Sequence, residues 1–183
     1  MDKKNGCGCS SLNQMKSCCD EDTRSAEKNR QLLLEFFYID LTTCERCMKT
    51  EEILTAAIAA VAPVLRMSGF ALEIKKTLVS TEEQARDLCL LSSPTIRLNG
   101  QDLQMDVRES QCAACGSICG EEIDCRVWVW RGEEYAVPPK QMLVDGILRA
   151  VYGDKHIEGE TLFQDLPLNL KKFFAAKKDK ENT

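Results

Sequence analysis

Residues 32–47, LLLEFFYIDLTTCERC, decide the fold of this chain. The apolar run from Leu32 to Ile39 predicts a strand that is buried on both faces. A short loop leads to a CxxC motif, Cys44-Glu45-Arg46-Cys47, and apolar residues with a period of 3.6 follow from Leu54 to Leu65. We therefore expect a strand, a loop and a long helix, with Cys44 at the helix N-terminus.

The start of a helix favours a thiolate, because unpaired backbone N–H groups and the positive end of the helix dipole lie there. In a redox interpretation, Cys44 is the exposed nucleophile and Cys47, one turn into the helix, is the resolving thiol. In a metal interpretation, the pair is half of a thiolate site that a second pair completes elsewhere. The remaining alternative is a chance spacing in a cysteine-rich chain.

Composition bounds the class of protein. The chain has 183 residues, eleven of them cysteines, and a net charge of −5. This length suits one domain with tails. The ends are basic and the long stretch between them is acidic, so we expect no nucleic-acid partner.

The chain begins without an apolar signal-peptide segment, and no run approaches the roughly 20 apolar residues of a membrane span. We therefore expect a cytoplasmic protein without a membrane partner, a setting in which cysteines are more often catalytic or metal-binding than disulfide-bonded.

The chain divides into three parts. Residues 1–30 form a polar leader whose four cysteines either capture a soft metal ion or belong to a disordered tail. Residues 31–153 form the domain, and residues 154–183 form a tail. Within the tail, the apolar residues of 166–174 predict a short amphipathic segment that docks on the body, and residues 177–183 should fray.

The domain continues with alternating strands and helices. Residues 70–78 have the period of a strand, which should run parallel to the first because one helix joins the two. A short helix is expected over 82–90. Pro94 opens the next strand, which an Asn-Gly turn connects to a returning strand over 101–105. A further hairpin is expected over 125–137, and Pro138-Pro139 then open a final helix that ends at Gly153.

An insertion of about residues 108–125 lacks a core pattern and contains four cysteines: Cys112, Cys115, Cys119 and Cys125. Four thiolates suit a tetrahedral zinc site, and their spacing differs from that of the bacterial ferredoxins, so zinc is favoured over an iron–sulfur cluster. The alternatives are a dithiol relay, in which Cys112 and Cys115 exchange with the first pair, and unpaired thiols. We expect no nucleotide cofactor.

Two other residues were candidates for chemistry. Cys89, between two leucines on the predicted second helix, is expected in the core. His156, the only histidine, follows the last predicted helix of the domain, so a Cys–His nucleophile pair has no evident base.

The order strand, CxxC, helix, strand, helix, proline, hairpin, helix resembles the thioredoxin-like fold. Cys44 and Cys47 match the motif of that family, and Pro94 matches its cis-proline. The resemblance implies an α/β fold with a mixed sheet flanked by helices, to which this chain adds the cysteine-rich insertion and a β-hairpin. Residues 94–100, PTIRLNG, also resemble the strand and turn after the proline in glutaredoxin-type members.

The likeness is greatest to an uncharacterised family of thioredoxin-like prokaryotic proteins, over roughly residues 31–153. Its members share the insertion, the Cys-Arg-Val-Trp strand at 125–128 and the Val-Tyr-Gly that ends the final helix. The chain departs from the better-known thioredoxins because Glu45-Arg46 replaces their Gly-Pro and no tryptophan precedes the motif.

Our leading hypothesis from the sequence is a thiol–disulfide oxidoreductase that acts on protein thiols and disulfides. Cys44 would attack, Cys47 would resolve, and Pro94 would shape the substrate groove. The main alternative is a protein that binds or transfers a soft ion such as zinc, mercury or arsenite without turnover. A structural module with a thioredoxin-like shape is the third class.

Overall fold

A mixed sheet of four strands forms the centre of the molecule. The computed structural model describes residues 30–120, 122–153 and 165–181. The strand order is β2-β1-β3-β4. The strands are β1 (Arg30–Tyr38), β2 (Phe70–Leu78), β3 (Thr95–Leu98) and β4 (Gln101–Asp102). Strand β1 is parallel to β2 and antiparallel to β3, so the predicted parallel pair is confirmed.

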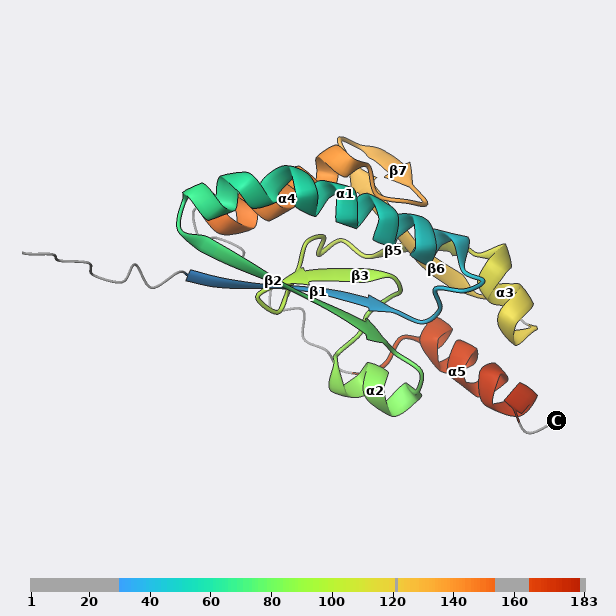
Figure 1. Cartoon of the computed structure of the whole chain (residues 1–183). Coiled ribbons are helices and arrows are strands. Elements are labelled where there is room, and N and C mark those ends of the chain that lie inside the picture. The colour runs from blue at the N-terminus through green and yellow to red at the C-terminus, as the bar shows by residue number, and fades with distance from the viewer. Residues whose placement is uncertain (1–29, 121, 154–164, 182–183) are drawn as a thin grey trace, which may run out of the picture.

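Helices flank this sheet, as the sequence predicted. Helices α1 (Glu45–Met67) and α4 (Lys140–Tyr152) lie together over one face, and α2 (Glu82–Asp87) lies on the other side (Figure 1). Leu34 and Phe36 of β1 are fully buried in the core between the sheet and α1. The architecture is a mixed α/β fold compatible with a thioredoxin-like arrangement. No helix in the described part of the chain combines the length and apolar character that a membrane crossing needs.

The insertion is more ordered than its sequence suggested. It contributes β5 (Arg108–Gln111), α3 (Ala113–Cys119) and part of β6 (Asp124–Trp130), and β6 pairs with β7 (Glu133–Tyr135) in the expected hairpin. The order of this second sheet is β5-β6-β7. The insertion has no core pattern in its sequence, yet Cys112, Cys115 and Ile123 are all buried. Its buried positions are few and irregularly spaced, so no periodicity revealed them.

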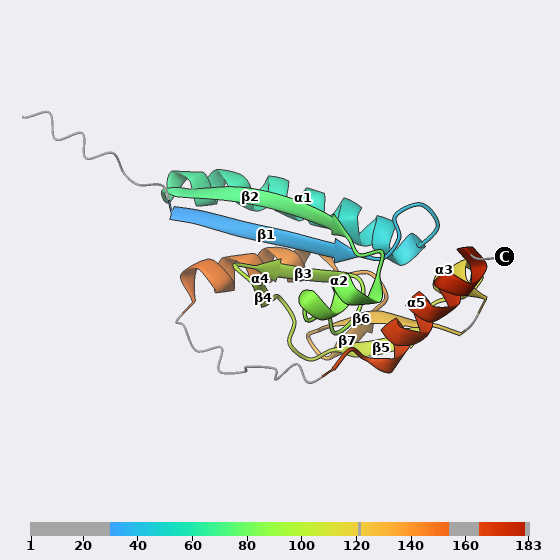
Figure 2. The same cartoon turned by 90° about the horizontal axis from the view of Figure 1, so that it is seen from below.

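The C-terminal segment docks on the body, as predicted. Its helix α5 (Leu168–Glu181) lies beside α3 and α2 at one end of the molecule (Figure 2). Leu170, Phe173 and Phe174 of α5 are buried there. The prediction that the chain frays from residue 177 was wrong, since α5 continues to Glu181.

The loops around the sheet bear on two further predictions. The Ser93–Pro94 peptide bond is cis, as the resemblance implied, and Asn99 and Gly100 both have positive φ angles, as the predicted turn requires. Cys89 is exposed and not part of the core, because α2 ends at Asp87 and Cys89 lies in the turn beyond it. The leader residues 1–29 and His156 lie outside the described residues.

A buried ion pair joins the two sheets. Arg126 of β6 is fully buried, and its guanidinium donates to both carboxylate oxygens of Asp102, at 3.1 and 2.7 Å. The same guanidinium donates to Thr95 Oγ1, and the backbone N–H of Arg126 donates to the Ser93 carbonyl. Arg126 therefore connects β6 to β4 and to the cis-proline loop.

Replacing Asp102 by alanine should lower the free energy of unfolding by about 3–5 kcal/mol, because Arg126 would keep a buried and uncompensated charge. Urea unfolding measures this change. The matched control is Glu134→Ala, which removes the exposed partner of Arg108 and should cost no more than about 1 kcal/mol. Equal losses in the two variants would contradict a special role for the buried pair.

Candidate thiolate site

The loop before α1 is held by one carboxylate. Asp40 accepts hydrogen bonds from the backbone N–H groups of Thr42, Thr43 and Cys44. Burial alone would raise the pKa of Asp40, but these N–H groups and the Thr42 hydroxyl together hold the pKa below its usual value. Asp40 thereby fixes the position of Cys44, which is the N-cap residue of α1. Asp40 is itself half-buried and organises this loop.

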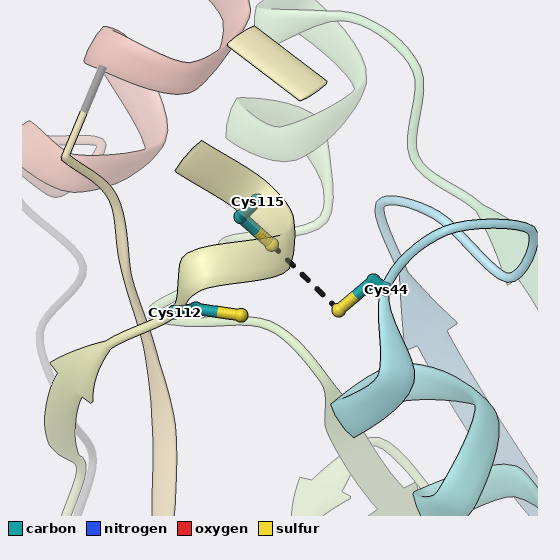
Figure 3. Close-up of side chains that lie close together, drawn as sticks. All are labelled: Cys44, Cys112 and Cys115. Carbon is teal, nitrogen blue, oxygen red and sulfur yellow. Dashed lines mark hydrogen bonds between the residues drawn. The ribbon is translucent and has the colours of Figure 1, made fainter. Parts of the chain in front are cut away.

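Three cysteine sulfurs converge at this end of α1. Cys44 projects from the start of the helix toward α3, where Cys112 and Cys115 point back toward it (Figure 3). The sulfur of Cys115 lies 3.6 Å from that of Cys44. All three sulfurs lie within 4.8 Å of one another. Residues about seventy positions apart in the sequence thus form a single cluster.

The local structure of the insertion explains this convergence. Cys112 is the N-cap residue of α3, and Cys115 follows one turn later, so their sulfurs fall on the same side of the helix. Strands β5 and β6 on either side of α3 pair in antiparallel register, with Ser110 opposite Cys125. This pairing brings the Cys125 sulfur to 3.2 Å from that of Cys115.

The thiols set one another's protonation. Hydrogen bonds from neighbouring thiols, that of Cys112 first, hold the pKa of Cys44 far below its usual value. Hydrogen bonds from Cys115 and Cys125 lower the pKa of Cys112 to about 6. The pKa values of Cys115 and Cys125 are raised by their hydrogen bonds to Cys112 and by burial. The pKa is thus lowered at Cys44 and Cys112 and raised at Cys115 and Cys125.

Cys47 lies beside this cluster, one turn into α1. Its interaction with Cys44 and its burial raise its pKa. The Cys47 sulfur also lies 3.9 Å from Ser93 Oγ, in the residue before the cis-proline. The structure thus brings the CxxC motif and the cis-proline loop together. Their catalytic roles stay a prediction.

Arg46, the third residue of the CxxC motif, fastens α1 to the insertion. Its guanidinium donates to the carbonyl oxygens of Ser110, Gln111 and Cys125, at 3.1, 2.7 and 3.2 Å, and to the Ser110 hydroxyl. These acceptors belong to the strand ends that carry α3. Arg46 therefore fixes the distance between Cys44 and the cysteines of the insertion.

The cluster is sealed from solvent. Cys44 and Cys115 have no exposed surface, and Cys112 is 4% exposed. The cysteines belong to a hydrophobic core that also contains Leu170, Phe173 and Phe174 of α5, so α5 helps to cover them. Lys180 of α5 donates to the carbonyl oxygens of Ser117 and Ile118 near the end of α3. The expectation of an exposed Cys44 nucleophile was wrong, because α3 and α5 pack over the start of α1.

The sequence placed the zinc ligands within the insertion and left open whether the CxxC pair joins a second cysteine pair, and the structure brings Cys44 together with cysteines of the insertion. Of the predicted metal ligands, Cys112, Cys115 and Cys125 lie together, and Cys44 joins them. Cys119 is the last residue of α3, and its side chain lies outside the described part of the structure. The signal in the sequence was the repeated C-x2-C spacing, since the two motifs each begin at a helix N-cap.

The fold and this site define a mixed α/β protein with a buried cluster of cysteines that could hold a metal ion. The chain belongs to the family described as Domain of unknown function (DUF2703), whose model matches residues 32–147. That match includes Cys44, Cys112, Cys115 and Cys125, and it ends before α5. It carries no thioredoxin-like assignment. Comparisons with curated proteins and with solved structures gave no match.

Replacing Arg46 by methionine should loosen the insertion while preserving much of the side-chain volume. We expect Cys112 and Cys115 to react with a thiol reagent at least about tenfold faster, because the insertion loses four hydrogen bonds to α1, each worth about 0.5–1.5 kcal/mol. Timed alkylation followed by peptide mass mapping measures these rates. Lys49→Met is the control, since Lys49 forms only an exposed ion pair with Glu45. Unchanged rates in Arg46→Met would show that the hydrogen bonds from Arg46 to the insertion are not needed to protect these cysteines.

Proposed function

We propose that this protein binds a soft, thiophilic metal or metalloid ion through the thiolates of Cys44, Cys112 and Cys115. The observation that carries the proposal is the mutual approach of three buried sulfurs to within 4.8 Å. Thiolates are soft ligands that select ions such as zinc, copper(I) and heavier thiophilic elements. Such an ion would screen thiolate charges that are otherwise costly to bury.

Burial also makes binding a better proposal than disulfide exchange with other proteins. A catalytic cysteine of an oxidoreductase has to be partly exposed, because a substrate disulfide must reach its sulfur in line. Cys44 has no exposed surface beneath α3 and α5. A small ion, by contrast, needs only a transient opening between α3, α5 and the start of α1 to reach the sulfurs.

Thiol–disulfide exchange is the second candidate, with a specific observation in its favour. Cys44 and Cys47 begin α1 in the CxxC spacing, and Cys47 lies against the residue before the cis-proline. This arrangement resembles that of thioredoxin-like oxidoreductases. In this candidate, the Cys44 sulfur would exchange first with the neighbouring Cys115 and only indirectly with an external partner.

Protein purified and kept without oxygen should contain about one equivalent of a soft ion per chain, or take it up when supplied, with protection of at least three thiols. Elemental analysis and a thiol count measure this. Cys44→Ala should lose the ion, whereas Cys89→Ala should keep it, because Cys89 is an exposed thiol away from the cluster.

The opposite result would be metal-free protein that takes up no soft ion and shows a reversible two-electron couple. Reduction of insulin disulfides that is lost in Cys44→Ala would then support the oxidoreductase and reject the binding protein. Because Cys44→Ala removes a sulfur in both cases, the elemental analysis decides between them.

A further inference from the structure

We infer that the ion bound at this site is a trivalent metalloid, of the class of arsenite and antimonite, held by three sulfurs. The inference rests on the thiolate-binding function proposed above and specifies its substrate. Three properties of the site support it: the number of mutually close sulfurs, the charge that the site can bury, and the chemistry of exchange.

The number of sulfurs favours three-coordination. The sulfurs that all lie within 4.8 Å of one another are those of Cys44, Cys112 and Cys115, and this set does not include Cys125. Cys125 lies 3.2 Å from the Cys115 sulfur and also interacts with Cys112 and Cys44, but it is not within 4.8 Å of all three sulfurs. A structural zinc site takes four ligands around one centre. The described cluster instead offers three converging ligands and one sulfur to the side.

The net charge of the complex also favours a trivalent ion over zinc. Three thiolates around a trivalent ion are neutral as a whole. Zinc with the same three thiolates leaves one net negative charge, and zinc with Cys125 as a fourth ligand leaves two. A net charge is costly in a site without exposed surface, among side chains such as Phe173 and Leu170.

Little positive charge is available to offset such an excess. The N-terminus of α1 supplies about half an elementary charge. Arg46 directs its guanidinium at carbonyl and hydroxyl oxygens of the insertion. The buried Arg126 is already paired with Asp102. A neutral complex is therefore the one that this environment accommodates at the lowest cost.

The exchange balances without a redox partner. Counted from three thiols, arsenous acid reacts as As(OH)3 + 3 RSH → As(SR)3 + 3 H2O. Three As–O bonds and three S–H bonds break, and three As–S bonds and three O–H bonds form. Arsenic remains trivalent, each sulfur passes from thiol to arsenic-bound thiolate at the same oxidation state, and the three hydroxides take up the three protons and leave as water. No net charge enters the buried site.

The test uses the full-length chain in reduced, oxygen-free form, with sodium arsenite and zinc chloride as probes. The cysteines that belong neither to the three-sulfur set nor to its neighbours Cys47 and Cys125 are replaced by serine so that they cannot bind arsenic themselves. The background substitutions are at Cys7, Cys9, Cys18, Cys19, Cys89 and Cys119. Equilibrium dialysis gives stoichiometry and affinity, and X-ray absorption at the arsenic edge counts the sulfurs.

We expect one arsenic per chain, bound by three sulfurs and no oxygen. Cys44→Ala, Cys112→Ala and Cys115→Ala should each weaken binding by more than about tenfold, because even the loss of a group that only orients a metal ligand costs about 10–100-fold. Cys125→Ala distinguishes three-coordination from four-coordination: because Cys125 contacts a ligand without being one, the variant should still bind one arsenic through three sulfurs and lose less affinity than any of the other three variants. The sulfur count in the background chain needs none of these variants, so a variant that misfolds does not prevent the test.

Two results would overturn the inference, and they differ in what they leave standing. Zinc bound by four sulfurs, lost in Cys125→Ala and not displaced by arsenite, would reject the metalloid and keep the thiolate-binding function. Failure of both probes to bind, with all cluster thiols still reactive after denaturation, would reject the inference and the proposed function together.

Discussion

The crowding of sulfur atoms in a site without exposed surface is the constraint on which this structure depends. Thiols in contact can share hydrogen bonds, and these bonds let Cys44 carry charge where solvent cannot stabilise it. The same crowding and burial raise the pKa of Cys115 and Cys125, so the pKa values of neighbouring sulfurs are shifted in opposite directions. A bound cation relieves that conflict, which is why the burial of the cluster and its proposed function have one physical origin.

The cover over the sulfurs comes from segments outside the central sheet. Helix α3 brings two of the cysteines and part of the cover, and Arg46 attaches its flanking strands to α1. Helix α5 completes the cover with apolar side chains and with Lys180 at the end of α3. The family match includes α3 but not α5. The sulfurs therefore belong to the shared domain, whereas part of their seal is supplied by the segment that follows it.

Strand β6 separates the sulfurs from the nearest buried cation. Cys125 and Arg126 are consecutive and therefore point to opposite faces of the strand. Both are buried, and Asp102 neutralises Arg126 on its side. The thiolates consequently gain little from this guanidinium. The backbone of Arg126 also donates to the Ser93 carbonyl, which holds the cis-proline loop in place beside Cys47.

The sequence by itself determined the local elements: the buried first strand, the helix after the CxxC motif, the parallel second strand, the Asn-Gly hairpin and the docking tail. Each follows from periodicity or from turn residues, which act over a few positions. The cysteine cluster needed the tertiary structure, because Cys44 and Cys115 meet only when strands β5 and β6 pair and Arg46 binds their ends. The burial of Cys44 was decided in the same way, since the segments that cover it follow it in the sequence by about seventy residues or more. A sequence pattern that spans only a few positions cannot predict that these distant segments cover Cys44.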